Sequence, residues 1–350
     1  MTSTDDAVPQ LPDGAAHINP SPCAEAASPS IMTPSLVPPP LHPFSIHTLA
    51  PLAPASVLGV LARLGIEYLG TYDGQSIFTL AWVQFIGCLL MGVFLAHRDS
   101  ITASYPPLYL ALTTGFCGSL TTFSGWQLDV FLAWASSDQV DRTTIHTIVQ
   151  GATRLFFTIA LSLGGIMFGT HVAKVLFAIP AAKSSPPPPQ SVRLVVSAVC
   201  GCAYLATIPA FVFLSQRERF IAVSALLYSF PGTLLRYTLS IRLNNPRFPT
   251  GTLTANLFGT ALLAAFYALQ HATNNVNGDA CVALQGLSDG FCGCLTTVST
   301  FALEVRSAKT RTAWVYVVIS VVAAQMLCVT ILVPVWVTGS VSRSLVCRAT

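Results

Sequence analysis

A short polar sequence with two glycines occurs twice in this chain, and it is the feature best suited to do chemistry. Residues 115–129 read GFCGSLTTFSGWQLD and residues 290–304 read GFCGCLTTVSTFALE, with nine of the fifteen positions identical. Both copies lie in long apolar stretches, where neighbouring Gly, Thr and Ser residues weaken a helix. Transport proteins use such helix breaks at membrane depth to build a site between two repeats. We therefore expect the two copies to form one shared site.

Each break frees backbone carbonyl groups that could hold a cation. Backbone polar groups cannot be left bare in lipid, so these carbonyls are expected to turn inward. Two breaks would supply four carbonyls to one buried ion, and the candidates are Gly118, Thr121, Gly293 and Thr296. The alternative is that the glycines only permit helices to cross closely.

The Phe, Ser and Thr residues of the motif could instead act on an anion. An aromatic ring is positive at its edge, so a ring presented edge-on stabilises an anion without the tight hold of a cationic side chain. Hydroxyl groups and the amide of Asn256 could replace lost water as hydrogen-bond donors. The alternative is that the phenylalanines face lipid or only pack the helices.

The composition indicates a membrane protein. Of 350 residues, 53% are hydrophobic and 9% are charged, whereas about 25% of the residues of soluble domains are charged. The net charge of +3, with no basic run or RNA-binding motif, excludes a nucleic-acid partner. No nucleophile–base pair, nucleotide fingerprint or zinc-ligand spacing is present, so we expect no enzyme. Most of the cysteines lie in apolar segments and are expected to pack helices.

The hydropathy pattern predicts an all-α membrane protein. A membrane crossing takes about 20 apolar residues. The nine segments of this kind lie near residues 47–69, 76–97, 107–134, 145–177, 191–215, 219–241, 250–271, 281–304 and 312–338. The third and eighth segments carry the repeated motif, so each is expected to be a broken helix.

The duplication extends to neighbouring segments. Gly59 and Arg63 recur, at the same spacing, as Gly232 and Arg236. An arginine inside a span needs a partner, a wet vestibule or a route to the interface. Two four-helix repeats separated by one odd helix would be inverted relative to each other around a central site. The predicted parts are an N-terminal tail (1–44), the first repeat (45–180), a linker with one transmembrane helix (181–218), the second repeat (219–338) and a C-terminal tail (339–350).

The distribution of Lys and Arg between the loops favours a cytoplasmic N-terminus. One side carries nine such residues, Arg98, Lys174, Lys183, Arg193, Arg242, Arg247, Arg306, Lys309 and Arg311. The other side carries five, Arg142, Arg217, Arg219, Arg343 and Arg348. The N-terminal tail is rich in Pro, Ser and Ala and lacks the basic and apolar regions of a signal peptide, so we interpret it as a disordered cytoplasmic tail.

The paired motif, together with GTLTANLFG at residues 251–259, closely resembles the CrcB/Fluc fluoride channel family. The fused arrangement resembles the eukaryotic form of that family, the FEX fluoride exporters, over residues 47–338. The resemblance implies a monomer whose linker helix inverts the second half. It also implies a structural sodium ion bound by backbone carbonyls of Gly118, Thr121, Gly293 and Thr296, the four residues chosen above.

The family has two parallel fluoride pores and a TTFSTF pattern in each half. Each pore pairs the first phenylalanine of this pattern in one half with the last phenylalanine of the pattern in the other half. Phe123 with Phe301 is a complete pair, whereas Val298 with Trp126 is a broken one. The resemblance therefore implies one working and one degenerate pore.

The pore asparagine of the family also indicates a single working pore. It is present once in this chain, as Asn256, whereas Gln84 stands at the equivalent position of the first repeat. Thr252, four residues before Asn256, shares its helical face. The helix after each motif contributes a polar track in the family, and which track lines the working pore stays open. The candidates are Tyr316 and Ser320 in the last helix and Thr158 and Ser162 in the fourth.

These observations lead to a passive channel that exports cytoplasmic fluoride through the plasma membrane, with fluoride and the lipid bilayer as its partners. The alternative is a proton-coupled or exchanging transporter for another small anion. An intramembrane enzyme is a third class, which the absence of a nucleophile–base pair argues against.

Overall fold

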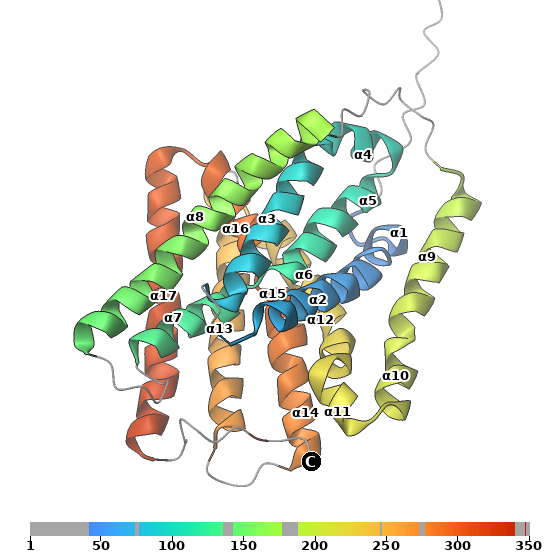
Figure 1. Ribbon diagram of the computed structural model, residues 1–350. Helices are drawn as coiled ribbons and strands as arrows, with labels where there is room; N and C mark the ends of the chain where they lie inside the picture. The colour runs from blue at the N-terminus through green and yellow to red at the C-terminus, as the bar shows by residue number, and fades with distance from the viewer. Residues whose placement is uncertain are drawn as a thin grey trace, which may run out of the picture. The chain divides into compact units, whose positions relative to one another are not determined.

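Long apolar helices dominate the computed structural model, which describes residues 42–73, 77–135, 143–176, 188–245, 247–272, 277–339 and 347 (Figure 1). Within these ranges the only strand-like pairing is an isolated bridge between Asn245 and Phe248. The described residues leave out the tail at 1–41 and the linker at 177–187. They also leave out four of the basic residues counted above, Arg142, Lys183, Arg343 and Arg348. The all-helical prediction is confirmed for the described part.

Six helical stretches in the described chain are long and apolar enough to cross a membrane. They are α1 with α2 (Ile46–Leu49 and Leu52–Gly70), α3 (Thr79–Ala96), α8 (Thr144–Leu176), α9 with α10 (Gln190–Leu205 and Thr207–Phe213), α13 (Thr250–Gln270) and α17 (Thr310–Val337). They match six of the nine predicted segments, and the protein is therefore a multi-pass membrane protein.

The other three predicted segments also contain helices, but none is both long and apolar enough to count as a span. The sixth is α12 (Ser224–Leu243), a less apolar helix with Pro231 inside it. It follows the short helix α11 (Gln216–Glu218) and the π-helical turn η2 (Arg219–Val223). The third and eighth are broken, as the motif predicted.

Both broken helices have the same construction. In the first repeat α4 (Arg98–Ser104) leads into α5 (Pro106–Leu110), then the π-helical η1 (Ala111–Cys117), α6 (Gly118–Leu120) and, after two extended threonines, α7 (Phe123–Trp134). In the second repeat α14 (Gly278–Gly286), η3 (Leu287–Cys292) and α15 (Gly293–Leu295) are followed in the same way by α16 (Val298–Ser307).

The second threonine of each Thr-Thr pair explains why a new helix starts there. Thr122 and Thr297 are extended N-cap residues, and their hydroxyl oxygens accept hydrogen bonds from the backbone N–H groups of Gly125 and Thr300. An N-cap of this kind satisfies one of the orphan donors of a first helical turn. The motif therefore ends one helix and begins the next within two residues.

The helices of the two repeats pack reciprocally. Within each repeat the first helix contacts the π-helical turn and the second pairs with the fourth, as α2 with η1 and α3 with α8, and again α12 with η3 and α13 with α17. Across the repeats α7 contacts α13 and α17, while α16 contacts α3 and α8. The short helices α6 and α15 meet at the centre (Figure 1).

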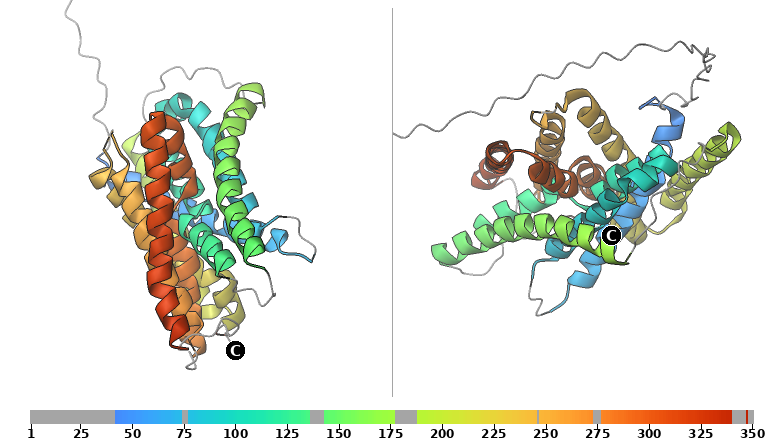
Figure 2. Two further views of the ribbon diagram at one scale, coloured as in Figure 1. Left: turned by 90° about the vertical axis from the view of Figure 1, so that its left-hand side faces the viewer. Right: turned by 90° about the horizontal axis from the view of Figure 1, so that it is seen from above.

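The linker helix lies at the edge of this arrangement. Only 11% of its apolar window is buried, and it contacts α1 and α2. The Tyr204 hydroxyl donates to the carbonyl of Leu227 at 2.7 Å, and the His47 ring bonds Ser197 at 2.9 Å. The fourth helices α8 and α17 lie on the side away from α9 (Figures 1 and 2).

Candidate functional site

The two helix breaks bind each other through their first threonines. Thr121 Oγ1 accepts the N–H groups of Val298 and Ser299 at 3.2 and 3.0 Å. Thr296 Oγ1 accepts those of Phe123 and Ser124 at 3.2 and 3.1 Å. Each threonine thus serves the first turn of the helix in the other repeat, and both are fully buried. The duplicated motif forms one shared centre, as its sequence predicted.

Each motif glycine at this centre faces an arginine of the other repeat. The Arg236 guanidinium lies against Gly118, and the Arg63 guanidinium lies against Gly293, so that a Cβ at either glycine would overlap it. Arg236 donates to the carbonyls of Cys294 and Thr114, both at 2.8 Å. The glycines therefore serve as close-contact positions.

Of the four residues proposed to bind sodium, Thr121 and Thr296 offer backbone carbonyls of a kind that would suit the ion. No hydrogen bond from another element reaches the carbonyls of Thr121 or Thr296 in the part of the chain that the structure describes. Neutral oxygen ligands suit hard cations. The two guanidinium groups beside Gly118 and Gly293 oppose a further positive charge.

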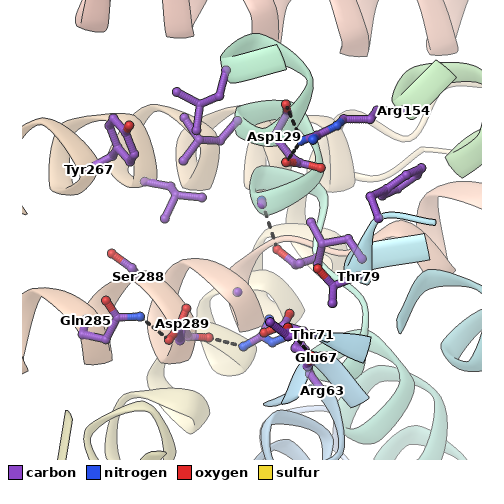
Figure 3. Close-up of a pocket in the computed structure, with 18 of the residues that line it drawn as sticks. Arg63, Glu67, Thr71, Thr79, Asp129, Arg154, Tyr267, Gln285, Ser288 and Asp289 are labelled. Carbon is purple, nitrogen blue, oxygen red and sulfur yellow. Dashed lines mark hydrogen bonds and ion pairs between the residues drawn. The ribbon is translucent and has the colours of Figure 1, made fainter. Parts of the chain in front are cut away.

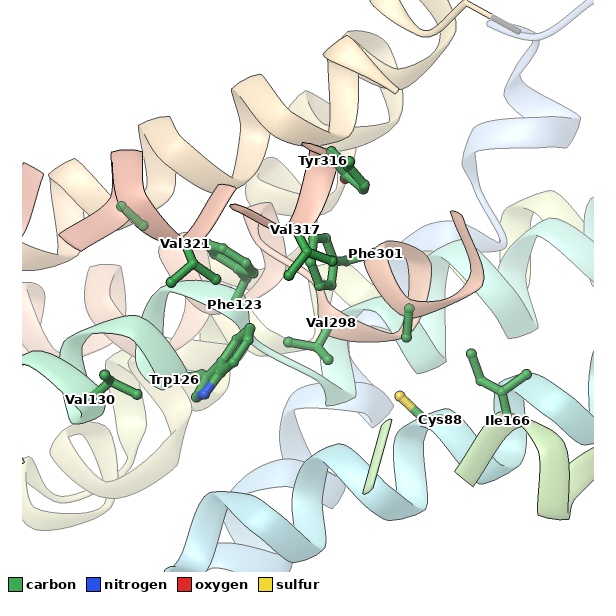
Figure 4. Packing of buried hydrophobic residues seen from close by; sticks show 12 residues of the cluster. Cys88, Phe123, Trp126, Val130, Ile166, Val298, Phe301, Tyr316, Val317 and Val321 are labelled. Carbon is green, nitrogen blue, oxygen red and sulfur yellow. The ribbon is translucent and has the colours of Figure 1, made fainter. Parts of the chain in front are cut away.

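The predicted phenylalanine pair meets in the structure. The rings of Phe123 and Phe301 lie 5.5 Å apart at 61°, an edge contact, and both are buried. The Phe301 ring also lies 5.0 Å from that of Tyr316, and the Phe123 ring lies 5.4 Å from that of Trp126. Figure 4 shows these side chains of α7, α16 and α17 converging in one cluster.

A carboxylate continues this aromatic cluster. Glu304 accepts the Tyr316 hydroxyl at 2.8 Å and the Thr252 hydroxyl at 2.6 Å, and the Asn244 amide lies 3.4 Å away. It lines a cavity of ≈ 220 Å³ between α16 and the loop before α13. Tyr316 and Thr252 were both predicted, but their meeting at Glu304 was not. The sequence around Glu304 gives no signal of which helices meet there.

Asn256 and Gln84 lie at equivalent positions in the second helix of each repeat, and each binds the helix break of its own repeat. Asn256 accepts from the N–H of Thr297 at 2.9 Å and donates to its carbonyl at 3.3 Å. Gln84 donates to the carbonyl of Thr122 at 2.7 Å, and its buried Oε1 atom has no hydrogen-bond partner in the described part of the chain. An amide nitrogen has two donors, so Asn256 keeps one N–H beyond its bond to Thr297.

The two predicted hydroxyl tracks are buried. Ser320, Thr158 and Ser162 all have hydroxyl oxygens without a hydrogen-bond partner among the described residues. Ser320 lies one helical turn after Tyr316, on the same face of α17. Ser162 also lines a small cavity.

The small cavity has a volume of ≈ 10 Å³, and its lining includes Trp126, Val298 and Ser162 as well as Phe301 of the phenylalanine pair; a single water needs about 10–15 Å³. The Trp126 indole N–H donates to the carbonyl of Arg154 at 3.1 Å, and Arg154 in turn pairs with Asp129. Side chains therefore fill this region.

A larger cavity lies beside Arg63, with a volume of ≈ 470 Å³. Arg63 donates to the main-chain carbonyl of Asp289, and Glu67 lies nearby on α2 (Figure 3). Arg236 is equally buried, and it donates to the backbone carbonyls of Cys294 and Thr114. The two equivalent arginines thus have different surroundings.

The helical membrane fold and the duplicated, crossed helix breaks define a two-repeat membrane protein. The family described as "CrcB-like protein, Camphor Resistance (CrcB)" matches residues 51–170 and 223–332, one segment in each repeat. The chain belongs to this family.

Its relatives include proteins that match most of the chain. Fluoride export protein 1 of Neurospora crassa is 33% identical over 331 residues, covering 77% of this chain and 63% of the relative, so the chain spans less than two thirds of that protein. Fluoride export protein 1 of Schizosaccharomyces pombe is 33% identical over 288 residues, covering 78% of this chain and 91% of the relative.

A bacterial relative matches a single repeat. Fluoride-specific ion channel FluC 1 of Staphylococcus aureus is 35% identical over 112 residues, covering 32% of this chain and 88% of the relative. No solved structure matches the chain significantly.

Proposed function

We propose that this protein is a passive channel through which fluoride leaves the cytoplasm. Relatives named fluoride export proteins match most of the chain. The observation that carries the proposal is the edge contact between Phe123 and Phe301, next to Tyr316 and to the turn of α17 that carries the unpartnered Ser320 hydroxyl. Ring edges and a free hydroxyl offer positive partial charge without a full cation. A full cation 4 Å away would bind the anion by about 4 kcal/mol at an effective dielectric constant of 20.

The working pathway connects two cavities. It starts at the cavity that contains Glu304, passes Tyr316 and the Phe123–Phe301 pair, and ends at the cavity beside Arg63. Asn256 lies along it with a free amide N–H. The ring edges of Phe123 and Phe301 and the amide N–H of Asn256 offer positive partial charge along this route, where fluoride would exchange its water for donors; the Tyr316 hydroxyl is already donated to Glu304.

The second pathway is degenerate in this proposal. Trp126 and Val298 replace the phenylalanine pair, and the space beside them, which Phe301 also lines, is ≈ 10 Å³. Beyond Trp126, the Asp129–Arg154 ion pair lies in the wall of the cavity beside Arg63. Close packing of α7, α8 and α16 is the role we propose for this region.

The proposed membrane arrangement has nine crossings, with the two repeats inverted and the N-terminus in the cytoplasm. The reciprocal contacts of α7 and α16 support the inversion. A sodium ion on the carbonyls of Gly118, Thr121, Gly293 and Thr296 would add positive charge at the centre of the site. Thr121 and Thr296 hold the two breaks in place, because each accepts hydrogen bonds from backbone N–H groups of the other repeat.

A passive channel in the plasma membrane would suffice for export. Fluoride enters as neutral HF in acid surroundings and is trapped as the anion inside. A negative interior then drives it out by about 2.3 kcal/mol per charge per 100 mV.

The test is fluoride efflux from liposomes that contain the purified protein. Vesicles are loaded with potassium fluoride, valinomycin carries the potassium, and an electrode records the fluoride. Chloride-loaded vesicles are the control. We expect fast fluoride efflux, no chloride efflux and no need for a counter-ion.

Two results would contradict the channel. Flux that requires an opposing proton or anion gradient would favour an exchanging transporter for a small anion. No fluoride flux from folded protein would remove the proposal altogether.

A further inference from the structure

A disulfide joins the start of α14 to the C-terminal tail. It links Cys281 with Cys347, 66 residues apart. The other described cysteines are free thiols: Cys88, Cys117, Cys200, Cys202, Cys292, Cys294 and Cys328. Disulfides form and persist in oxidising compartments and are rare in the cytosol. The bond therefore assigns this end of the bundle to the extracellular side of the membrane.

The loop charges give the same assignment by an independent route. Nine Lys and Arg residues lie on one predicted side and five on the other, and Cys281 and Cys347 fall on the poorer side. In Figure 1, α14 and α4 lie at opposite ends of the bundle, and α4 carries Arg98 of the richer side. The cavity beside Arg63 then opens to the outside.

A series of hydrogen bonds runs from the disulfide to this cavity. The N–H of Cys347 donates to the carbonyl of Gln270 at 2.9 Å. The Gln270 side chain donates to Gln285 at 2.8 Å, and Gln285 donates to the carboxylate of Asp289 at 2.6 Å. Arg63 donates to the main-chain carbonyl of the same Asp289 (Figure 3).

This geometry fixes the Arg63 guanidinium in the wall of the outer cavity. Gln285 donates to the Asp289 carboxylate and Arg63 donates to the carbonyl of that residue, while Glu67 and the Asp289 carboxylate also interact electrostatically with Arg63. Asp289 lies in the π-helical η3, four residues after Gln285. Thr114, its counterpart before the first motif, has no carboxylate.

We propose that the Cys281–Cys347 disulfide is an external staple that positions Gln285 and Asp289 and so keeps the Arg63 guanidinium facing anions in the outer cavity. Gln285 is the positioning residue. The effect on ion flux rests on the proposed channel function, whereas the location of the staple does not. Bond formation removes two electrons and two protons from the thiols, and a protein-disulfide oxidant of the secretory pathway accepts them as its dithiol form.

The location is tested on the full-length protein in intact cells. An impermeant phosphine is applied outside; it becomes the phosphine oxide with oxygen from water, and the disulfide becomes two thiols. An impermeant maleimide mass tag then counts the thiols. We expect two additional tags after reduction, and none in a C281S/C347S double variant. New tags that appear only after the cells are permeabilised would overturn the assignment.

The bracing is tested by fluoride uptake from the outside at increasing external concentration. Reduction, the C281S/C347S variant and Gln285→Leu should each raise the half-saturating concentration about two- to tenfold, the factor expected from one lost hydrogen bond. The maximal rate should stay near that of the wild type. Asp289→Asn keeps a side-chain acceptor for Gln285 and the carbonyl but removes a negative charge beside Arg63, so the half-saturating concentration should not rise, and Cys202→Ser is the control for cysteine replacement.

An unchanged half-saturating concentration would overturn the bracing, and so would a fall in maximal rate alone, since that is the result of poorer folding. If the wild type moves no fluoride, the channel proposal fails instead. The tag count would still decide where the staple lies.

Discussion

The guanidinium group of Arg236, carried by the second repeat, lies directly against Gly118 in the broken helix of the first repeat. The equivalent pair, Arg63 and Gly293, makes the same contact in the opposite direction. Each repeat therefore inserts a charged side chain into the break of the other. A glycine without a side chain is what makes room for it.

We expect Gly118→Ala to destabilise the protein by about 1–3 kcal/mol, the usual cost of overpacking a core. Arg236 cannot move aside freely, because it is buried and bound to two carbonyls. Thermal unfolding in detergent measures the effect. The control is Gly164→Ala in α8, where a Cβ meets nothing within 4 Å and the helix gains about 0.5–1 kcal/mol. Equal stability of the two variants would contradict the contact.

We expect Phe301→Ile to abolish fluoride efflux, because it removes the ring edge that Phe123 faces. Loss of even about 1.4 kcal/mol at the barrier lowers the rate tenfold. Liposome efflux measures the change. The matched control is Phe156→Ile in α8, since Phe156 is 67% exposed at the surface. Full flux from folded Phe301→Ile protein would disprove the single-pore assignment.

Asn256→Asp should also abolish efflux. The substitution replaces the N–H that bonds the carbonyl of Thr297 with an oxygen, and it places a negative charge on the anion pathway. Gln84→Glu makes the same chemical change at the equivalent amide, which bonds Thr122. If only one pore works, folded Gln84→Glu protein keeps its flux, as efflux and gel filtration together would show. Loss of flux in both variants would indicate two working pores.

The sequence predicted the features that depend on local pattern. The duplicated Gly and Thr residues predicted a broken third helix in each repeat, because glycine weakens a helix and threonine caps the next one. The bounds of the six apolar helices followed from hydropathy. Of the site, the meeting of Phe123 with Phe301 was predicted, and Thr252 and Tyr316 were predicted as separate candidates.

The remaining contacts join distant parts of the chain and leave no local pattern. Glu304 receives hydroxyl groups from α13 and α17, and nothing in the motif around it indicates which helices pack there. Cys281 and Cys347 have no spacing that would predict a disulfide. The crossing of Arg63 and Arg236 depends on how the two repeats dock, which only the packed structure shows.

Val298→Phe should restore little transport by itself. The new ring completes the phenylalanine pattern of the second repeat, but Trp126 still fills the partner position, and the cavity between them is ≈ 10 Å³. The larger side chain should overpack the site and cost about 1–3 kcal/mol of stability. The measurement is fluoride efflux in the Phe301→Ile background, so that only a revived second pore contributes. Recovery of wild-type flux there would show that Val298 alone keeps the second pathway closed, and the role assigned to Trp126 would be wrong.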